Sequence, residues 1–219
     1  MKRIILGSAS PRRRELLRLM GVEFEVMVSG EEEHYHGTFP QDVVKELALA
    51  KAEGVARLLD EEALHKVMDN SIPAVGTESQ SVVGAASVPE PCLVIGADTV
   101  VVKDGKILGK PKDEGEAFAM LRGLQGRSHE VYTGVALLEL AGGVVHVRSS
   151  HAEGTRVFVH GMGDDEIRAY ISSGEAMDKA GAYGIQGRFA VFVDRVEGDY
   201  YNVVGLPVAY LYRQLKRWG

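Results

Sequence analysis

The chain has 219 residues, which fits one large domain or one domain with an insertion, and a core of that size is stable without disulfide bonds. Its 25 basic and 31 acidic side chains sum to a net charge of −6, which excludes the broad basic field that holds long nucleic acids or anionic membranes. With a single cysteine, Cys92, and no apolar run near the ~18 residues of a membrane span, we expect a soluble, cytosolic protein without an intrachain disulfide.

The N-terminal part of the chain predicts two strands and two helices. Small residues from Gly7 to Ser10 end a short apolar run, and Pro11 is favoured at the first position of a helix. In order, we predict a strand over residues 3–6, a helix from Pro11 to about Gly21, a strand over 22–28 and a helix from Pro40 to about residue 59. Residues 61–91 keep no sustained period, and we interpret them as a long loop or insertion within a single domain.

The C-terminal part predicts hairpins and short helices. Asp104-Gly105 is a strong hairpin-turn signal, and Asp113 with Glu116 resembles a capping box. We predict strands over 92–102, 107–108, 129–140, 144–149, 155–160 and 189–195, and helices from Asp113 to Leu124, from Asp164 and from Pro207. This mixture predicts an α/β or α+β fold with a mixed sheet rather than a strictly alternating parallel one.

The first candidate site is the segment Leu-Gly-Ser-Ala-Ser-Pro-Arg-Arg-Arg-Glu-Leu-Leu, residues 6–17. A strand followed by a tight turn and a helix start presents unpaired backbone N–H groups at the positive end of a helix dipole. Ser8 adds a hydroxyl, and Arg12 and Arg13 add guanidinium donors that suit phosphate. The segment lacks the Gly-Lys-Ser/Thr element of a Walker loop, and solvated arginines on a capped helix are the alternative.

Lys51 is the second candidate. Apolar residues at positions 44, 47, 55 and 58 follow helical spacing, and position 51 falls on the same inward face. Its ammonium group either reaches solvent past the core or points into a pocket, where it needs an anion. The stripe leaves both possibilities open.

Asp98 is the sharpest candidate because it lies inside an apolar strand, residues 93–102. A buried carboxylate is strongly unfavourable unless it meets a cation, a metal or hydrogen-bond donors. If Asp104-Gly105 form a two-residue turn, the register pairs position 99 with Lys110 and brings that lysine next to Asp98. We favour an active-site acid beside a phosphate-binding lysine over a structural salt bridge, because flanking glycines leave room for a ligand.

Two loops complete the candidate set. Glu31-Glu32-Glu33 is a charge run of the kind that is usually solvated, yet carboxylates also hold Mg²⁺ against substrate phosphates. Residues 178–187, Asp-Lys-Ala-Gly-Ala-Tyr-Gly-Ile-Gln-Gly, combine small residues that allow close backbone approach with Gln186, whose amide can recognise a base edge. A flexible turn is the alternative for this glycine-rich loop.

Together and in this order, these segments resemble the Maf family of nucleoside triphosphate pyrophosphatases. The resemblance covers residues 3–60 and 93–217, nearly everything outside the segment 61–91. The matching motifs are Ser8-Ala9-Ser10-Pro11-Arg12-Arg13, Lys51-Ala52, Gly96-Ala97-Asp98-Thr99, Gly109-Lys110-Pro111, Asp178-Lys179-Ala180-Gly181-Ala182-Tyr183-Gly184-Ile185-Gln186-Gly187 and Val204-Gly205-Leu206-Pro207.

The resemblance implies a Maf/HAM1-like α/β fold, with a mixed sheet flanked by helices and two lobes around a cleft, and a homodimer. It implies hydrolysis of a nucleoside triphosphate to the monophosphate and pyrophosphate, with a divalent cation that is Mg²⁺ or, alternatively, Mn²⁺ or Co²⁺. Water deprotonated by Asp98, the general base, would attack the α-phosphorus, while Glu33 would join Asp98 as a metal-binding or catalytic carboxylate. Phosphates would be held by Lys51, Lys110, Ser8, Arg12 and Arg13.

The pair Thr99 and Gln186 matches the subfamily that acts on dTTP and UTP, whereas a sister subfamily acting on 7-methyl-GTP differs at both positions. Two features depart from the family pattern. Three glutamates stand where the family usually carries Asp-Glu, so Glu32 is an alternative to Glu33, and the segment 61–91 is unusually long. The alternative functions are a pyrophosphatase for 7-methyl-GTP or a non-standard purine triphosphate, and a non-catalytic nucleotide-sensing division regulator.

Overall fold

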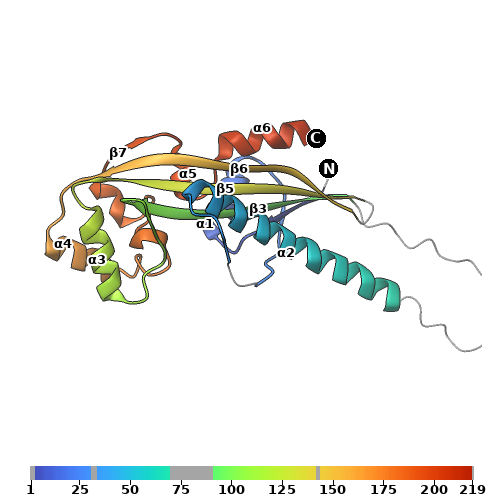
Figure 1. Cartoon of the computed structure of the whole chain (residues 1–219), viewed down its shortest axis with the longest axis horizontal. Coiled ribbons are helices and arrows are strands. Elements are labelled where there is room, and N and C mark those ends of the chain that lie inside the picture. Colours follow the sequence, from blue (N-terminus) through green and yellow to red (C-terminus); the bar gives the residue numbers. More distant parts are fainter. Residues whose placement is uncertain (1–2, 31–33, 70–90, 142–143, 219) are drawn as a thin grey trace, which may run out of the picture.

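A mixed sheet of seven strands runs through the molecule (Figure 1). The computed structural model describes residues 3–30, 34–69, 91–141 and 144–218. The strands are β1 (Arg3–Gly7), β2 (Glu25–Val26), β3 (Cys92–Lys103), β4 (Lys106–Leu108), β5 (Ser128–Ala141), β6 (Val144–Val159) and β7 (Val193–Glu197). The helices are α1 (Pro11–Leu19), α2 (Pro40–Asp69), α3 (Glu114–Leu124), α4 (Asp164–Ile171), α5 (Tyr200–Val204) and α6 (Val208–Trp218), with 3₁₀ turns η1 (Ala180–Ala182) and η2 (Arg188–Phe192).

The strand order is β2-β1-β3-β5-β6-β7, and β4 pairs with β3 outside this row. β1 is parallel to both β2 and β3, whereas β3, β5, β6 and β7 are antiparallel neighbours. The consecutive strands β3–β4 and β5–β6 form antiparallel hairpins, β3–β5 and β6–β7 are antiparallel pairs joined by longer connections that contain helices, and the connections through α1 and α2 produce the parallel pairs. The predicted α/β fold with a mixed sheet is therefore confirmed.

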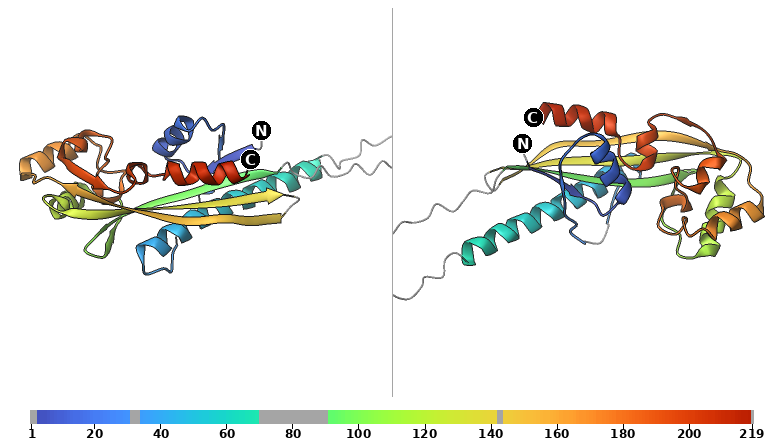
Figure 2. Two further views of the ribbon diagram at one scale, coloured as in Figure 1. Left: turned by 90° about the horizontal axis from the view of Figure 1, so that it is seen from above. Right: turned by 180° about the vertical axis from the view of Figure 1, so that it is seen from behind.

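Helices cover both faces of the sheet (Figure 2). Helix α2 lies on one face, where its alanines pack with Ile5, Val94 and Leu138. Helices α1 and α6 lie on the other face, over a larger core that includes Leu6, Leu93 and buried side chains of both helices. This core continues to one end of the sheet, where α3, α4 and the two 3₁₀ turns form an end lobe (Figure 1). Among the described helices, none combines the length and the apolar character needed to cross a membrane.

The backbone of α2 touches the sheet directly at two glycines. A Cβ atom built on Gly96 of β3 would lie 2.0 Å from the carbonyl oxygen of Ala48, and one built on Gly134 of β5 would lie 1.9 Å from that of Val44. Ala48 and Ala52 are fully buried at this contact. Only glycine allows so close an approach, and this approach fixes where the side chains of α2 meet β3.

Several predicted elements change where tertiary pairing outweighs local pattern. The strand predicted over 22–28 shrinks to the two residues of β2, and α5 was not predicted. The two strands predicted over 144–149 and 155–160 form a single strand, β6, because β5 pairs with it along its whole length. Helix α2 continues to Asp69, so residues 61–69 of the predicted insertion are helical, while residues 70–90 lie outside the described residues.

The strand predicted over 189–195 is wrong in its first half. Phe189 is buried and Phe192 is partly buried, whereas Val191 between them is 75% exposed. This spacing of three is the period of a 3₁₀ helix rather than that of a strand, and η2 precedes β7 accordingly.

A buried histidine ties the end lobe to the sheet. His129, near the start of β5, is 3% exposed, and its Nε2 lies 2.6 Å from the hydroxyl of Tyr183. Tyr183 packs in turn against Phe189 at a ring-centroid distance of 4.5 Å. Burial, with a smaller contribution from the charge of Lys103, lowers the pKa of His129 to about 4, so the ring is neutral at pH 7.

Replacing Gly96 with alanine should push α2 away from β3 and lower the free energy of unfolding by about 3 kcal/mol or more, because the new Cβ meets backbone. Gly123→Ala is the matched control, since a Cβ there meets nothing within 4 Å and alanine favours a helix. Denaturant unfolding of both variants measures the difference. Equal stabilities for the two would contradict the close helix–sheet contact.

The depressed pKa of His129 predicts a loss of stability in mild acid. Above pH 6.5 the ring is neutral in both the folded and the unfolded state. Below pH 6.5 the ring binds a proton in the unfolded chain, whereas in the folded protein it stays neutral down to about pH 4. The contribution is about 3 kcal/mol across this window. Unfolding measured from pH 7 to pH 4 should show a weaker pH dependence in His129→Gln than in the wild type, and an equal pH dependence of the two proteins would contradict the lowered pKa.

Candidate functional site

The topology singles out the carboxyl ends of β1 and β3. From β1 the chain crosses to β2 on one side and then through α2 to β3 on the other, which makes this the point where strand order reverses. Ligands of open α/β sheets bind at such switch points. The ladder of β1 with β3 ends at Gly7 and Gly96, and β4 joins β3 only from Val101. Among the described strands, residues 97–100 of β3 therefore lack a partner on this edge.

Asp98 lies on this unpaired edge, on the face of the sheet that α2 covers. Its carboxylate accepts a hydrogen bond from Lys51 of α2 and forms an ion pair with it. The side chains are 11% and 24% exposed, so the pair is shielded yet reachable from solvent. The sequence predicts Lys51 on the inward face of its helix and requires a cation, a metal or hydrogen-bond donors for Asp98, with Lys110 as the expected cation. The structure joins the two expectations in one contact.

The strand pairing that was expected to bring Lys110 next to Asp98 does not form. The β3–β4 hairpin has the predicted register, with Lys103 opposite Lys106 and Val101 opposite Leu108. The ladder stops at Leu108, however, because Gly109 leaves it and its carbonyl accepts from Gly181 at 3.0 Å. Lys110 is exposed next to the glycine-rich loop, and the predicted pairing of positions 99 and 110 is wrong.

Thr99 points to the opposite face from Asp98, as alternation along a strand requires. Its hydroxyl oxygen accepts a hydrogen bond of 3.0 Å from Arg13 of α1. Arg13 also donates to the hydroxyl of Ser8 at 2.9 Å and to the carbonyl of Gly205 at 2.8 Å. With 8% exposure, Arg13 holds three segments of the chain together at the switch point. The described contacts of Ser8 and Arg13 are thus internal.

Arg12, the neighbouring residue, is partly buried, and its positive charge acts on Asp178 of the glycine-rich loop. The pKa of Asp178 is lowered: burial opposes the shift, but the hydrogen bond from Lys179 and the charges of Lys179 and Arg12 outweigh it. In the same loop, Gln186 is exposed. The structure therefore places Arg12, Lys110 and Gln186 as accessible polar groups around a loop that is anchored by its buried residues.

The acidic loop with Glu33, Glu32 and Glu31 lies outside the described residues. Elsewhere in the part of the chain that the structure describes, no three His, Cys, Asp or Glu side chains lie close enough together to hold a metal ion. Asp98 supplies one carboxylate at the switch point. One or two carboxylates together with substrate phosphates are a donor set that suits Mg²⁺, so the residues fit a cation that arrives with a nucleotide.

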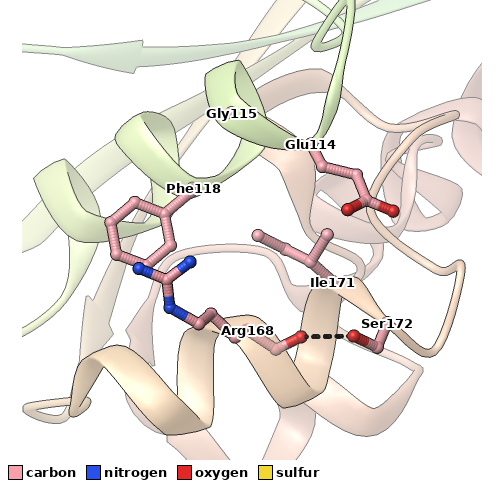
Figure 3. Close-up of a pocket in the computed structure, with 6 residues that line it drawn as sticks. All are labelled: Glu114, Gly115, Phe118, Arg168, Ile171 and Ser172. Carbon is pink, nitrogen blue, oxygen red and sulfur yellow. Dashed lines mark hydrogen bonds between the residues drawn. The ribbon is translucent and has the colours of Figure 1, made fainter.

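A hollow of about 440 Å³ lies elsewhere, between α3 and α4 (Figure 3). The guanidinium of Arg168 lies over the ring of Phe118, 4.7 Å from its centroid. The hollow contains none of the candidate site residues. Its lining residues are Glu114, Gly115, Phe118, Arg168, Ile171 and Ser172.

Two polar residues that were not among the sequence candidates lie in the core next to Thr99. Thr133 of β5 and Asn202 of α5 are fully buried and continue the hydrogen bonds of Thr99 away from the surface. Thr133 falls within the predicted strand 129–140 as an ordinary strand residue, and the sequence predicts no helix at the position of α5. A polar residue within a strand is a weak signal, whereas a buried asparagine one turn before Gly205 becomes visible only in the fold.

The Lys51–Asp98 contact should show a coupling energy that surface pairs lack. Lys51→Met alone leaves a shielded carboxylate without its cation and should cost about 2 kcal/mol, while adding Asp98→Asn should recover part of this loss. A double-mutant cycle by denaturant unfolding measures the coupling. The matched cycle at the exposed pair Arg3–Glu25 should give less than about 1 kcal/mol, and equal couplings would argue against the shielded contact.

Comparison with known proteins finds relatives that match nearly the whole chain. A family model described as Maf-like protein matches residues 3–218. The dTTP/UTP pyrophosphatase of Carboxydothermus hydrogenoformans is 43% identical over 99% of both chains. The proteins of that name from Pelotomaculum thermopropionicum and Geobacillus sp. are 44% and 45% identical, covering all of this chain and 98% and 100% of their own lengths. The chain therefore belongs to the Maf-like protein family.

Proposed function

We propose that the protein is a pyrophosphohydrolase that converts dTTP and UTP to the nucleoside monophosphate and pyrophosphate. The observation that carries the proposal is the Lys51–Asp98 pair on the unpaired edge of β3, at the point where strand order reverses. Relatives that are 43–45% identical over the whole chain and named dTTP/UTP pyrophosphatase support the choice of nucleotide.

In the reaction we propose, Asp98 accepts a proton from a water molecule as the water oxygen attacks the α-phosphorus. The bond between that phosphorus and the oxygen bridging to the β-phosphorus breaks, and pyrophosphate leaves. Lys51 holds the carboxylate in place and adds positive charge beside the developing negative charge. A divalent cation, Mg²⁺ or alternatively Mn²⁺ or Co²⁺, would neutralise phosphate oxygens when held by Asp98 and Glu33.

We assign phosphate binding first to Arg12 and Lys110, because both are accessible cations near the glycine-rich loop. Ser8 and Arg13 shape the turn after β1 that faces the phosphates. Thr99 and Gln186 would contact the base, Thr99 from the unpaired edge of β3 and Gln186 from its exposed position in the loop.

A homodimer in the cytoplasm is also part of the proposal, on the strength of the family resemblance. The net charge of −6 supports a small nucleotide rather than a long nucleic acid as the partner, because a triphosphate needs only a local cluster of cations. In the proposed complex, Arg12, Lys51 and Lys110 would supply these cations.

A nucleotide panel with added Mg²⁺, scored by pyrophosphate release, tests this function. We expect turnover of dTTP and UTP at least about tenfold faster than turnover of 7-methyl-GTP or inosine triphosphate. A preference for 7-methyl-GTP or a purine would replace the proposed substrate, and tight binding without turnover would favour a nucleotide-sensing protein. Asp98→Asn should lower turnover of UTP by a factor of about 10³ or more while nucleotide binding persists.

Glu139→Gln is the control for Asp98→Asn. Glu139 of strand β5 is also a buried carboxylate, and it accepts a hydrogen bond from Trp218 of α6. Its replacement should leave turnover close to that of the wild type. Full activity in Asp98→Asn, or an equal loss in both variants, would exclude Asp98 as the base.

A further inference from the structure

A chain of buried hydrogen bonds runs inward from Thr99. Its hydroxyl lies 2.9 Å from that of Thr133, the residue directly opposite on β5. The hydroxyl of Thr133 donates to the backbone carbonyl of Asn202 at 2.9 Å. At the outer end, Arg13 donates to Thr99 at 3.0 Å. The chain thus links α1, two neighbouring strands and α5.

The direction of every hydrogen bond in this chain follows from counting protons. A carbonyl oxygen only accepts, so the single hydroxyl hydrogen of Thr133 is committed to Asn202. Thr133 is therefore the acceptor in its contact with Thr99, and the hydrogen of Thr99 points inward. A guanidinium only donates, so Arg13 occupies one lone pair of the Thr99 oxygen. Thr99 has no hydrogen left to offer a ligand, only its second lone pair.

The inner end of the chain is held rigidly. Asn202 is fully buried, and its side-chain amide donates to the carbonyl of Val131 at 2.9 Å and to the hydroxyl of Thr155 at 2.8 Å. Thr155 is also buried and donates to the carbonyl of Asp199 at 3.0 Å. The carbonyl of Asn202 also accepts from the backbone N–H of Gly205 at 3.0 Å, but reversing the chain would turn the lone pairs of the Thr133 oxygen toward that carbonyl oxygen and leave two acceptors in contact inside the core, which is costly. The polarity is therefore built into the fold.

We propose that Thr133 and Asn202 are specificity-determining residues, because they hold Thr99 as a pure hydrogen-bond acceptor at the edge of the site. Such an acceptor suits a base that presents an N–H group, as uracil and thymine do at N3. It opposes cytosine, whose N3 is itself an acceptor with no hydrogen. This inference rests on the proposed function, in which the partly exposed Thr99 contacts the base.

The test compares the binding of α,β-imido UTP and α,β-imido CTP by titration calorimetry with Mg²⁺, since neither is cleaved between the α and β positions. The wild type should prefer the UTP analogue by about tenfold or more. Thr133→Val keeps the shape of the side chain but releases the hydrogen of Thr99 for cytosine N3, so the preference should fall towards one. Thr133→Ser restores the hydroxyl and should restore the preference.

Glu139→Gln is the matched control, because it changes another buried polar side chain of β5, one that accepts a hydrogen bond from Trp218 and is not part of the chain that runs from Thr99 to Asn202. It should keep the preference of the wild type. If Thr133→Val fails to fold, Thr99→Val decides the question: losing an acceptor weakens binding of the UTP analogue and spares the CTP analogue. The inference is overturned by an unchanged preference in Thr133→Val, by an equal loss in Glu139→Gln, or by a selective loss of the CTP analogue in Thr99→Val.

The binding assay separates this inference from the proposed function. A wild type that prefers the UTP analogue and loses the preference in Thr133→Val, yet releases no pyrophosphate from UTP, upholds the inference and refutes the proposed catalysis. A wild type that hydrolyses UTP but binds both analogues equally refutes the inference and leaves the catalysis standing.

Discussion

The contact between Lys51 and Asp98 is the interaction on which the site depends. A carboxylate in the middle of a buried strand needs a cation, and Lys51 reaches it because the backbone of α2 rests directly on β3 and β5. Gly96 and Gly134 make that approach possible, and each stands on the α2 face beside Asp98. The close packing of α2 on the sheet therefore also determines which cation meets the carboxylate of Asp98.

The switch point divides two tasks between the faces of one strand. Asp98 faces α2 and pairs with Lys51, whereas Thr99 faces α1 and belongs to a hydrogen-bond chain that runs from Arg13 to Asn202. In the proposed function, a nucleotide meets both residues at the edge where β3 has no strand partner. Phosphate chemistry and base recognition are then supported by separate networks, so that a change in one need not disturb the other.

Much of this arrangement could be predicted from sequence because it follows from local rules. The stripe in α2 placed Lys51 inward, the apolar run around Asp98 required a cation, a metal or hydrogen-bond donors, and Asp104-Gly105 gave the correct register of β3 with β4 as far as Leu108. The identity of the cation could not be predicted, since it depends on how closely α2 packs on two glycines. Arg13 illustrates the same limit: its sequence neighbours suggest phosphate, but its partners, Thr99 and Gly205, are distant in sequence.

A crystal structure with α,β-imido dTTP and Mg²⁺ tests the central claim most directly. The account predicts the α-phosphorus beside the carboxylate of Asp98 and the base against Thr99, with the nucleotide lying along the unpaired edge of β3. Finding the nucleotide in the hollow between α3 and α4, or with its phosphates away from Asp98, would contradict the account.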